Sequence, residues 1–362
     1  MKVVAFGTYD VSRHPRMNVI IEGLRSHGYD IEECNIPLAV DTARRVRGVA
    51  QPWRLVGPIF RLVWTWVRLS LRSRGVVRPD LVIVGYLGSI DIHLARILWP
   101  RAPVVLDQLI FAGDTALDRG VGKPWMGRFL DWVDRRAIRS ADTVLVDTEE
   151  NLDLIPRDFR HRGLVVPVGA SESWFHSRRS LPDGPLRVVF FGLYTPLQGA
   201  TVIGETMALL RDAPIEWTMI GSGQELEATR RRAGGVPGAT WIDWVDADEL
   251  PGVVAGHHVC LGIFGTGSKA LRVVPNKVYQ GAAAGCAVIT SDTPPQRRAL
   301  ADGALFVPAG DANALKETIL SLADDRESCR KASDRARSRA EAVFKPATVV
   351  MSLVDQPSFR AS

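Results

Sequence analysis

A glycine-rich turn followed by a lysine-bearing helix start is the part of this sequence best suited to binding an anion. The apolar run 261–264 leads into the turn 265–269 (GTGSK), and Asn276 and Lys277 stand at the start of a helical pattern. Glycines let backbone amides approach an anion, and a helix N-terminus carries about half a positive charge. With Lys269 and Lys277, these segments predict a diphosphate pocket, although their spacing matches neither the P-loop nor the G-x-G-x-x-G pattern.

Alternating strands and helices must position this pocket. Short apolar runs recur along the chain, each followed by a helical pattern, at 3–6, 81–84, 104–106, 143–146, 188–191, 217–220, 259–263 and 287–290. Such alternation predicts parallel sheets with helices on both faces. Ligands of doubly wound sheets bind beyond the carboxyl ends of the strands, so the loops after these runs are where chemistry is expected.

The length of 362 residues exceeds what one core usually holds, which predicts two domains. A stretch rich in Ser, Arg, Pro and Gly at 177–185 separates two sets of strands. We therefore expect an N-terminal domain over 1–180 and a C-terminal domain over 181–345. Residues 346–362 are expected to form a tail, with a return to the first domain as one option.

Composition indicates an ordinary globular protein of a reducing compartment. Hydrophobic residues make up 46% and charged residues 23% of the chain, and its four cysteines are scattered without metal-ligand spacing. The first residues enter a strand pattern without the features of a signal peptide, and no run of about eighteen apolar residues occurs. We expect a cytoplasmic protein that needs no metal or other cofactor.

The net charge of +5 is concentrated in one segment. No acid occurs between Asp41 and Asp80, whereas arginines and tryptophans are frequent there, and 53–73 has the pattern of an amphipathic helix. Such a helix can lie on an anionic membrane surface with its tryptophans at headgroup level. Residues 42–79 are thus a candidate membrane contact, the alternative being a packed helix with a solvated arginine face. No nucleic-acid reader motif accompanies the charge, so we expect no nucleic-acid partner.

Four motifs of this chain resemble those of one enzyme family. They are an apolar strand and loop (FGLYTPLQG), a glycine turn (IGSGQ), a helix ending in small residues (YQGAAAGCAVI) and a strand (SADTVLVDT), at 191–199, 220–224, 279–289 and 140–148. All four resemble the family 4 retaining glycosyltransferases, over nearly the whole chain and more strongly in its second half. The resemblance implies the α/β GT-B fold: two facing, Rossmann-like, doubly wound domains with an interdomain cleft. The N-terminal domain would bind the acceptor and the C-terminal domain the nucleotide-sugar donor.

The chain departs from the family's pattern at the donor site. Where many members carry an arginine and a lysine for the diphosphate, and two glutamates eight positions apart, this chain has Leu193, Gln198, Arg272 and Gln280. The signature Pro-Asn-Lys-x-Tyr occurs in some bacterial members, which indicates a divergent branch. We expect Lys277, helped by Lys269 and Arg272, to supply the missing cations. Gln280 can still hydrogen-bond a ribose hydroxyl.

The resemblance implies a donor site built from the turns and the helix start of the second half. The candidate donor-binding residues are Gly192, Gly221, Trp244, Gly265, Thr266, Gly267, Ser268, Lys269, Arg272, Asn276, Lys277 and Gln280. Trp244 follows a further strand-like run at 240–243 and stands where members seat the base, with a packing tryptophan as the alternative. Lys269 is alternatively a solvated loop lysine.

Two loops of the first half carry the other candidates. The loop 7–17 offers Asp10, Arg13 and Arg16 for phosphate or the polar groups of an acceptor. His14 in the same loop is a catalytic candidate, with helix capping as its alternative. Asp107 stands where members often place a histidine near the reacting sugar, so it could act as general base toward an acceptor hydroxyl. Its alternative is a helix cap or an ordinary loop carboxylate.

The expected activity is transfer of a sugar from a nucleotide-diphosphate sugar to a hydroxyl of a glycan, a lipid-linked acceptor or a small molecule. That the transfer retains the anomeric configuration of the sugar is implied only by the resemblance. The leaving diphosphate would assist attack on the same face, while the protein stabilises its charge. The alternative is a nucleotide-sugar epimerase or isomerase of the same fold. The protein would be cytoplasmic, with peripheral contact at the plasma membrane as a further option.

Overall fold

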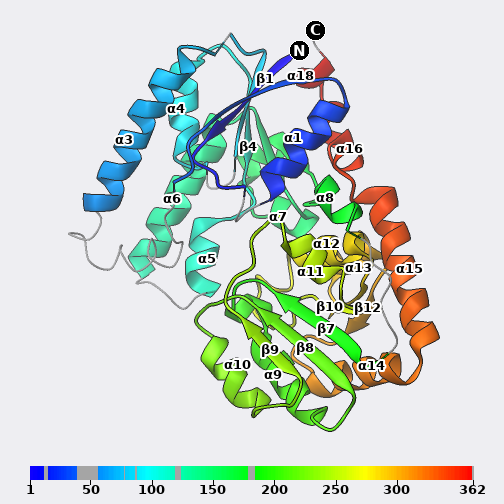
Figure 1. Ribbon diagram of the computed structural model, residues 1–362. Coiled ribbons are helices and arrows are strands. Elements are labelled where there is room, and N and C mark those ends of the chain that lie inside the picture. Colours follow the sequence, from blue (N-terminus) through cyan, green and yellow to red (C-terminus); the bar gives the residue numbers. More distant parts are fainter. Residues whose placement is uncertain are drawn as a thin grey trace. The chain divides into compact units, whose positions relative to one another are not determined.

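A computed structural model describes residues 1–11, 15–38, 56–76, 78–85, 88–118, 124–177 and 184–360 of the chain. The chain divides into two compact units (Figure 1). Unit 1 comprises Met1–Pro167 and Val349–Ser362, and unit 2 comprises Val168–Thr348. The first division therefore comes earlier in the chain than the polar joint at 177–185, and residues from Val349 onward group with unit 1.

Unit 1 is built on a six-stranded sheet with the order β2-β1-β3-β4-β5-β6, in which all neighbours are parallel. Its strands are β1 (Lys2–Gly7), β2 (Asp30–Asn35), β3 (Leu81–Val84), β4 (Val104–Asp107), β5 (Thr143–Val146) and β6 (Gly163–Val165). Strand β3 is apolar throughout and β4 is apolar except for Asp107 at its end, and both are fully buried, as expected for a sheet covered on both faces.

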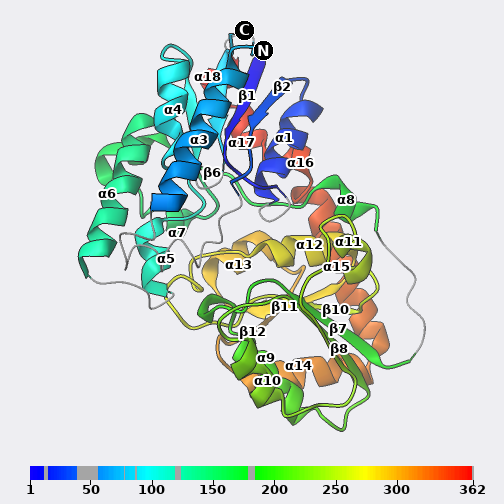
Figure 2. The same ribbon diagram turned by 60° about the vertical axis from the view of Figure 1, so that its left-hand side comes forward.

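Two separate apolar clusters cover the faces of this sheet. One cluster includes residues of α3, α4 and α6, and the other includes residues of α1, α17 and α18 (Figure 2). The helices of this part of the chain are α1 (Arg16–Ser26), α3 (Val56–Ser73), α4 (Asp91–Leu98), α5 (Ala112–Asp118), α6 (Pro124–Ser140), α7 (Glu149–Leu152), the 3₁₀-helix η2 (Arg157–Arg162), α16 (Pro346–Val349), α17 (Met351–Val354) and α18 (Pro357–Arg360). Helices α17 and α18 thus complete the core of a sheet whose strands all precede unit 2 in the chain.

Unit 2 contains a second parallel sheet, with the order β12-β11-β10-β7-β8-β9. Its strands are β7 (Leu186–Phe191), β8 (Ile215–Ile220), β9 (Ala239–Ile242), β10 (Val259–Leu261), β11 (Ala287–Ser291) and β12 (Leu305–Val307). Its helices are α8 (Glu172–Phe175), the 3₁₀-helix η3 (Pro196–Gln198), α9 (Ala200–Leu209), α10 (Leu226–Ala233), α11 (Leu250–Val254), α12 (Asn276–Ala284), α13 (Pro294–Leu300), α14 (Ala312–Asp324) and α15 (Arg326–Val343).

Every strand expected from an apolar run is present, but three further strands were not expected. Strands β2, β6 and β12 each lie at the edge of a sheet. An edge strand is covered less completely and needs no continuous apolar run; β2 reads DIEECN and is mostly half-exposed. The periodicity of the sequence therefore identified the central strands and missed these edges.

Within the ranges that the structure describes, no helix is both long enough and apolar enough to cross a lipid bilayer. Helix α3 agrees with the amphipathic helix expected over 53–73, as far as its described part reaches.

We expect the last helix to contribute directly to the stability of unit 1. Phe359 is buried and packs edge-to-face on Tyr29, with ring centroids 5.7 Å apart. Phe359→Ala should lower the free energy of unfolding by about 3 kcal/mol, because it leaves a cavity in this core. Urea unfolding measures the change, and Met351→Ser, at an exposed position of α17, serves as control. Equal stabilities of the two variants would contradict the packing.

Candidate functional site

The carboxyl ends of β7, β8 and β10 join three loops of unit 2 into one assembly. The backbone N–H of Tyr194 donates to the carbonyl of Ser222 at 2.9 Å, and the N–H of Phe264 donates to the carbonyl of Gln198 at 3.0 Å. The loops expected to bind the donor therefore meet at one edge of the sheet, where ligands of doubly wound sheets bind.

Glycines allow these loops to approach one another. Gly221 has a φ of +121°, and a side chain there would come within 1.9 Å of the carbonyl oxygen of Gly192. A Cβ on Gly265 would lie 2.5 Å from the carbonyl oxygens of Pro196 and Leu197. The sequence assigned Gly265 to close approach of a ligand, whereas the structure shows it in close approach to the neighbouring loop. Gly192, Gly221 and Gly265 thus shape the edge on which a donor would rest.

Lys277 lies at the centre of this edge. It stands in the first turn of α12, which begins at Asn276 directly after Pro275, and its side chain is almost wholly buried. Its Nζ donates to Oε1 of Gln198 at 2.5 Å and lies 3.7 Å from the centroid of the Phe190 ring. The amide and the ring face are the partners that hold this ammonium group.

Burial lowers the pKa of Lys277 to about 7. The lysine is therefore poised between its charged and neutral forms near neutral pH. An anion that reaches its Nζ would favour the charged form, since an opposite charge stabilises it. A Cβ built on Gly192 would lie 3.2 Å from this Nζ, so the glycine lets the ammonium lie close to the loop after β7.

The other donor candidates of unit 2 differ in exposure. Thr266, Gly267 and Ser268 are exposed. In the turn that follows them, the N–H of Arg272 donates to the carbonyl of Lys269 at 3.1 Å. Gln280 is buried one turn after Lys277 on α12.

Trp244 is 59% exposed, and its indole N–H donates to Oδ1 of Asp246 at 3.1 Å. Such exposure does not fit the alternative of a packing tryptophan. It leaves a ring face open to a base.

In unit 1, the structure brings two candidates together as one buried ion pair. Nε of Arg16, the first residue of α1, donates to Oδ1 of Asp107 at 2.7 Å, and both side chains are 0% exposed. Nη1 of Arg16 donates to the carbonyl of Val166 at 2.8 Å. Neither side chain reaches the surface in this arrangement, so contact with an acceptor requires that the pair be uncovered.

A third buried group belongs to this pair and was not expected from the sequence. Asp147 follows β5 and accepts from Nδ2 of Asn151 at 2.7 Å. Burial raises the pKa of Asp107 and of Asp147, and the Arg16 guanidinium partly opposes the rise in each. The position of Asp147 directly after the expected strand 143–146 was the signal that could have identified it.

The remaining candidates of unit 1 lie in the loop after β1. Asp10 is half-buried there. Arg13 and His14 lie outside the described residues.

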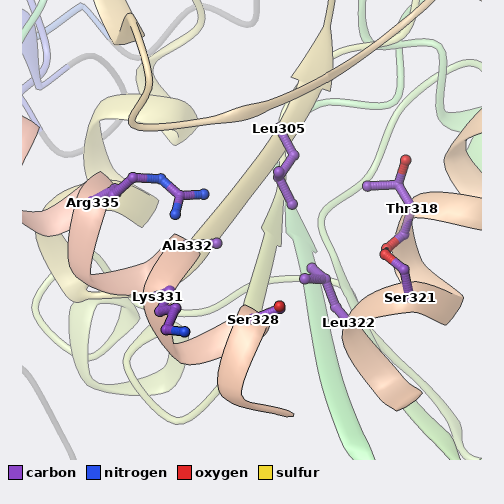
Figure 3. A pocket seen from close by; sticks show the side chains of 8 residues that line it. All are labelled: Leu305, Thr318, Ser321, Leu322, Ser328, Lys331, Ala332 and Arg335. Atoms are coloured by element: carbon purple, nitrogen blue, oxygen red, sulfur yellow. The ribbon is translucent and has the colours of Figure 1, made fainter. Parts of the chain in front are cut away.

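A pocket of about 410 Å³ elsewhere in unit 2 does not belong to this edge (Figure 3). Its lining includes Leu305, where β12 begins, whereas the donor loops follow strand ends. The remaining lining residues are Thr318, Ser321, Leu322, Ser328, Lys331, Ala332 and Arg335, all from α14 and α15. None of the donor candidates lines it.

Residues 185–325 match the family model of the glycosyl transferases group 1. This segment lies within unit 2 and contains all three loops of the donor edge. No curated protein sequence is significantly similar to the chain.

Solved structures of low sequence identity share the fold over the whole chain. Sucrose-phosphate synthase from Thermosynechococcus elongatus is similar with a TM-score of 0.71 and 16% identity, covering 100% of both chains. The trehalose-6-phosphate synthase OtsA is similar with a TM-score of 0.67 and 13% identity, and the match covers 100% of this chain and 99% of that chain. HepE from Anabaena, in complex with UDP-glucose, is similar with a TM-score of 0.66 and 11% identity, and the match covers 98% of each chain. This likeness confirms the expected GT-B fold.

We expect Arg16 to be essential for the stability of unit 1. Arg16→Met leaves the Asp107 carboxylate buried without its cation, which should cost about 3 kcal/mol of unfolding free energy. Burial then raises the pKa of Asp107 further, so the deficit should shrink in acid, where the carboxyl is protonated in both states, and grow as pH rises.

Urea unfolding at several pH values measures this deficit. The double variant Arg16→Met/Asp107→Leu removes both charges and should recover much of the stability. A single variant as stable as wild type, or a double variant worse than the single one, would refute the assignment.

Proposed function

We propose that this chain, a glycosyltransferase with the GT-B fold, moves a sugar from a nucleotide-diphosphate sugar to a hydroxyl group with retention of configuration. The observation that supports the donor class is the buried Lys277, which lies at the donor edge inside the segment matched by the family model. Neither the family match nor the similar structures favour the epimerase alternative.

Lys277 is the proposed ligand of the donor diphosphate. Its ammonium replaces the cations that many family members carry at the positions of Leu193 and Gln198, and it contacts Gln198 directly. Lys269 and Arg272, in the turn that precedes α12, assist it. The negative charge that develops on the leaving diphosphate is thereby stabilised by protein cations rather than by a metal ion.

The other donor contacts are proposed at the same edge. Backbone amides of residues 265–268 would bind sugar and phosphate oxygens, and Asn276, at the start of α12, is a further proposed ligand. Gln280 is proposed to bind a ribose hydroxyl and Trp244 to stack on the base. HepE binds UDP-glucose, so uridine donors are the first to test.

In a retaining transfer the leaving diphosphate assists attack on the same face, so the protein must stabilise its charge and orient both substrates. Asp107 is the proposed general base that takes the proton of the acceptor hydroxyl, with His14 as a second catalytic candidate and Asp10, Arg13 and Arg16 toward the acceptor. Because Arg16 and Asp107 are buried as a pair, acceptor binding must uncover the carboxylate for this role.

The acceptor is proposed to be a glycan, a lipid-linked sugar or a small molecule. We further propose that the protein is cytoplasmic and that the arginine-rich segment 42–79 contacts an anionic membrane surface. Of this segment the structure describes 56–76, 78 and 79.

A panel of nucleotide sugars tests the activity. Slow hydrolysis of one donor to its nucleoside diphosphate, accelerated by an acceptor, would support transfer. Conversion to an isomeric nucleotide sugar would refute it in favour of epimerisation. The anomeric configuration of the product, determined by NMR, decides between retention and inversion.

Lys277→Met should weaken binding of the nucleoside diphosphate by about 2 kcal/mol, because it removes a charge-assisted contact and keeps the side-chain length. Isothermal titration calorimetry measures the affinity. Lys331→Met, at an exposed lysine of the same unit, should leave it unchanged. Equal affinities of wild type and Lys277→Met would remove Lys277 from the site.

The ratio by which wild type binds the nucleoside diphosphate more tightly than Lys277→Met, here called its advantage, should also depend on pH. Lys277 is charged below its pKa of about 7, so the advantage is full there. Above pH 7 the anion must bind a neutral lysine or recharge it, so the advantage should fall by up to tenfold for each pH unit. Comparing the two proteins cancels the titration of the ligand. An advantage that stays constant from pH 6 to 9 would contradict the buried, titrating lysine.

A further inference from the structure

Helix α6 of unit 1 carries a row of aromatic side chains on its exposed side. Trp125, Phe129 and Trp132 are exposed, and their spacing of four and three residues places them in one stripe. The rings of Phe129 and Trp132 stack with centroids 6.0 Å apart and 23° between their planes. Arg136 extends the row, with its guanidinium 5.9 Å from the Trp132 ring centroid.

Helix α3 is likewise turned with its most apolar stripe outward. Among the α3 residues whose side chains the structure describes, the buried ones are Thr65, Leu69 and Ser73, two of which are polar. Phe60 and Trp64 are exposed, the latter by 58%, and the stripe continues through Ile59, Val63, Val67 and Leu71. A helix that packs only against its own domain normally buries such a stripe. The exposed one calls for an apolar partner.

The two helices belong to one layer. Both pack against α4, and residues of all three helices join the same core cluster over one face of the sheet of unit 1 (Figure 2). Their exposed stripes therefore belong to one helical layer and lie outside the core that this layer forms with the sheet. A pocket of about 290 Å³ lies between α4 and α6, lined by Ser89, Ile90, His93, Trp132, Val133 and Arg136.

The charges around the stripes select the kind of partner. Helix α3 carries arginines and no acid, and α6 exposes Arg128, Arg135 and Arg136 beside the single exposed acid Asp131. Tryptophans with flanking arginines match the headgroup region of an anionic bilayer, where the rings enter and the cations meet phosphates. A second copy of this chain would instead bring two arginine-rich faces together, and like charges oppose such a contact.

We propose that α6 and α3 together form one docking surface for an anionic phospholipid bilayer, with Trp125, Phe129 and Trp132 inserted among the headgroups. The inference rests on the membrane contact proposed for residues 42–79 and adds to it a second helix outside that segment. The surface holds unit 1 on the membrane, which suits an acceptor that is itself anchored in lipid.

Co-sedimentation of the full chain with vesicles, without donor or acceptor, tests the proposal. Wild type should bind vesicles of phosphatidylcholine with phosphatidylglycerol and not those of phosphatidylcholine alone, and added salt should weaken binding. The triple variant Trp125→Ser/Phe129→Ser/Trp132→Ser should reduce the partition coefficient by about tenfold or more, because it removes the inserted apolar area. Arg128→Gln and Arg135→Gln should each reduce it by about fivefold.

Met351→Ser, 53% exposed on the opposite face of the unit 1 sheet, is the matched control and should bind as wild type does. Circular dichroism verifies that the triple variant is folded. If wild type binds and the triple variant binds equally well, the role of α6 is overturned while the contact of α3 stands. If wild type does not bind anionic vesicles, the membrane proposal itself fails. It also fails if sedimentation equilibrium shows that wild type is a dimer and the triple variant a monomer. Neither result bears on donor hydrolysis.

Discussion

The burial of one ammonium group organises the donor edge of unit 2. Lys277 can stay buried because the Phe190 ring and the Gln198 amide replace part of its hydration. Those partners belong to β7 and η3, so the contact links the start of α12 to the first strand and loop of the unit. The same group that holds these elements together is the proposed ligand of the donor diphosphate.

In unit 1, a buried ion pair joins two elements in a comparable way. Arg16 and Asp107 join the start of α1 to the end of β4, but both are fully enclosed. Their mutual charge compensation makes the pair tolerable inside the core, and Asp147 adds a second carboxyl to it. Unit 2 thus holds a single buried cation at the edge of its sheet, whereas unit 1 holds a buried ion pair.

Much of the fold was predictable from the sequence, because central parallel strands are continuous apolar runs, as at 81–84 and 287–290. The importance of Lys277 was also predictable from its place at a helix start. Its partners were not, since Gln198 is 79 residues away and only the folded chain joins them. Periodicity likewise reveals the stripe Trp125, Phe129 and Trp132 but not which side of α6 faces water. The site roles themselves stay predictions until they are measured.

The tail helices α17 and α18 determine when the core of unit 1 can be completed during synthesis of the protein. Unit 2 is a continuous insertion, and unit 1 acquires its last core residues, among them Leu353 and Phe359, only after every residue of unit 2 has left the ribosome. Domains tend to fold as they emerge. One apolar face of the first sheet therefore stays incomplete until the last residues of the chain are available.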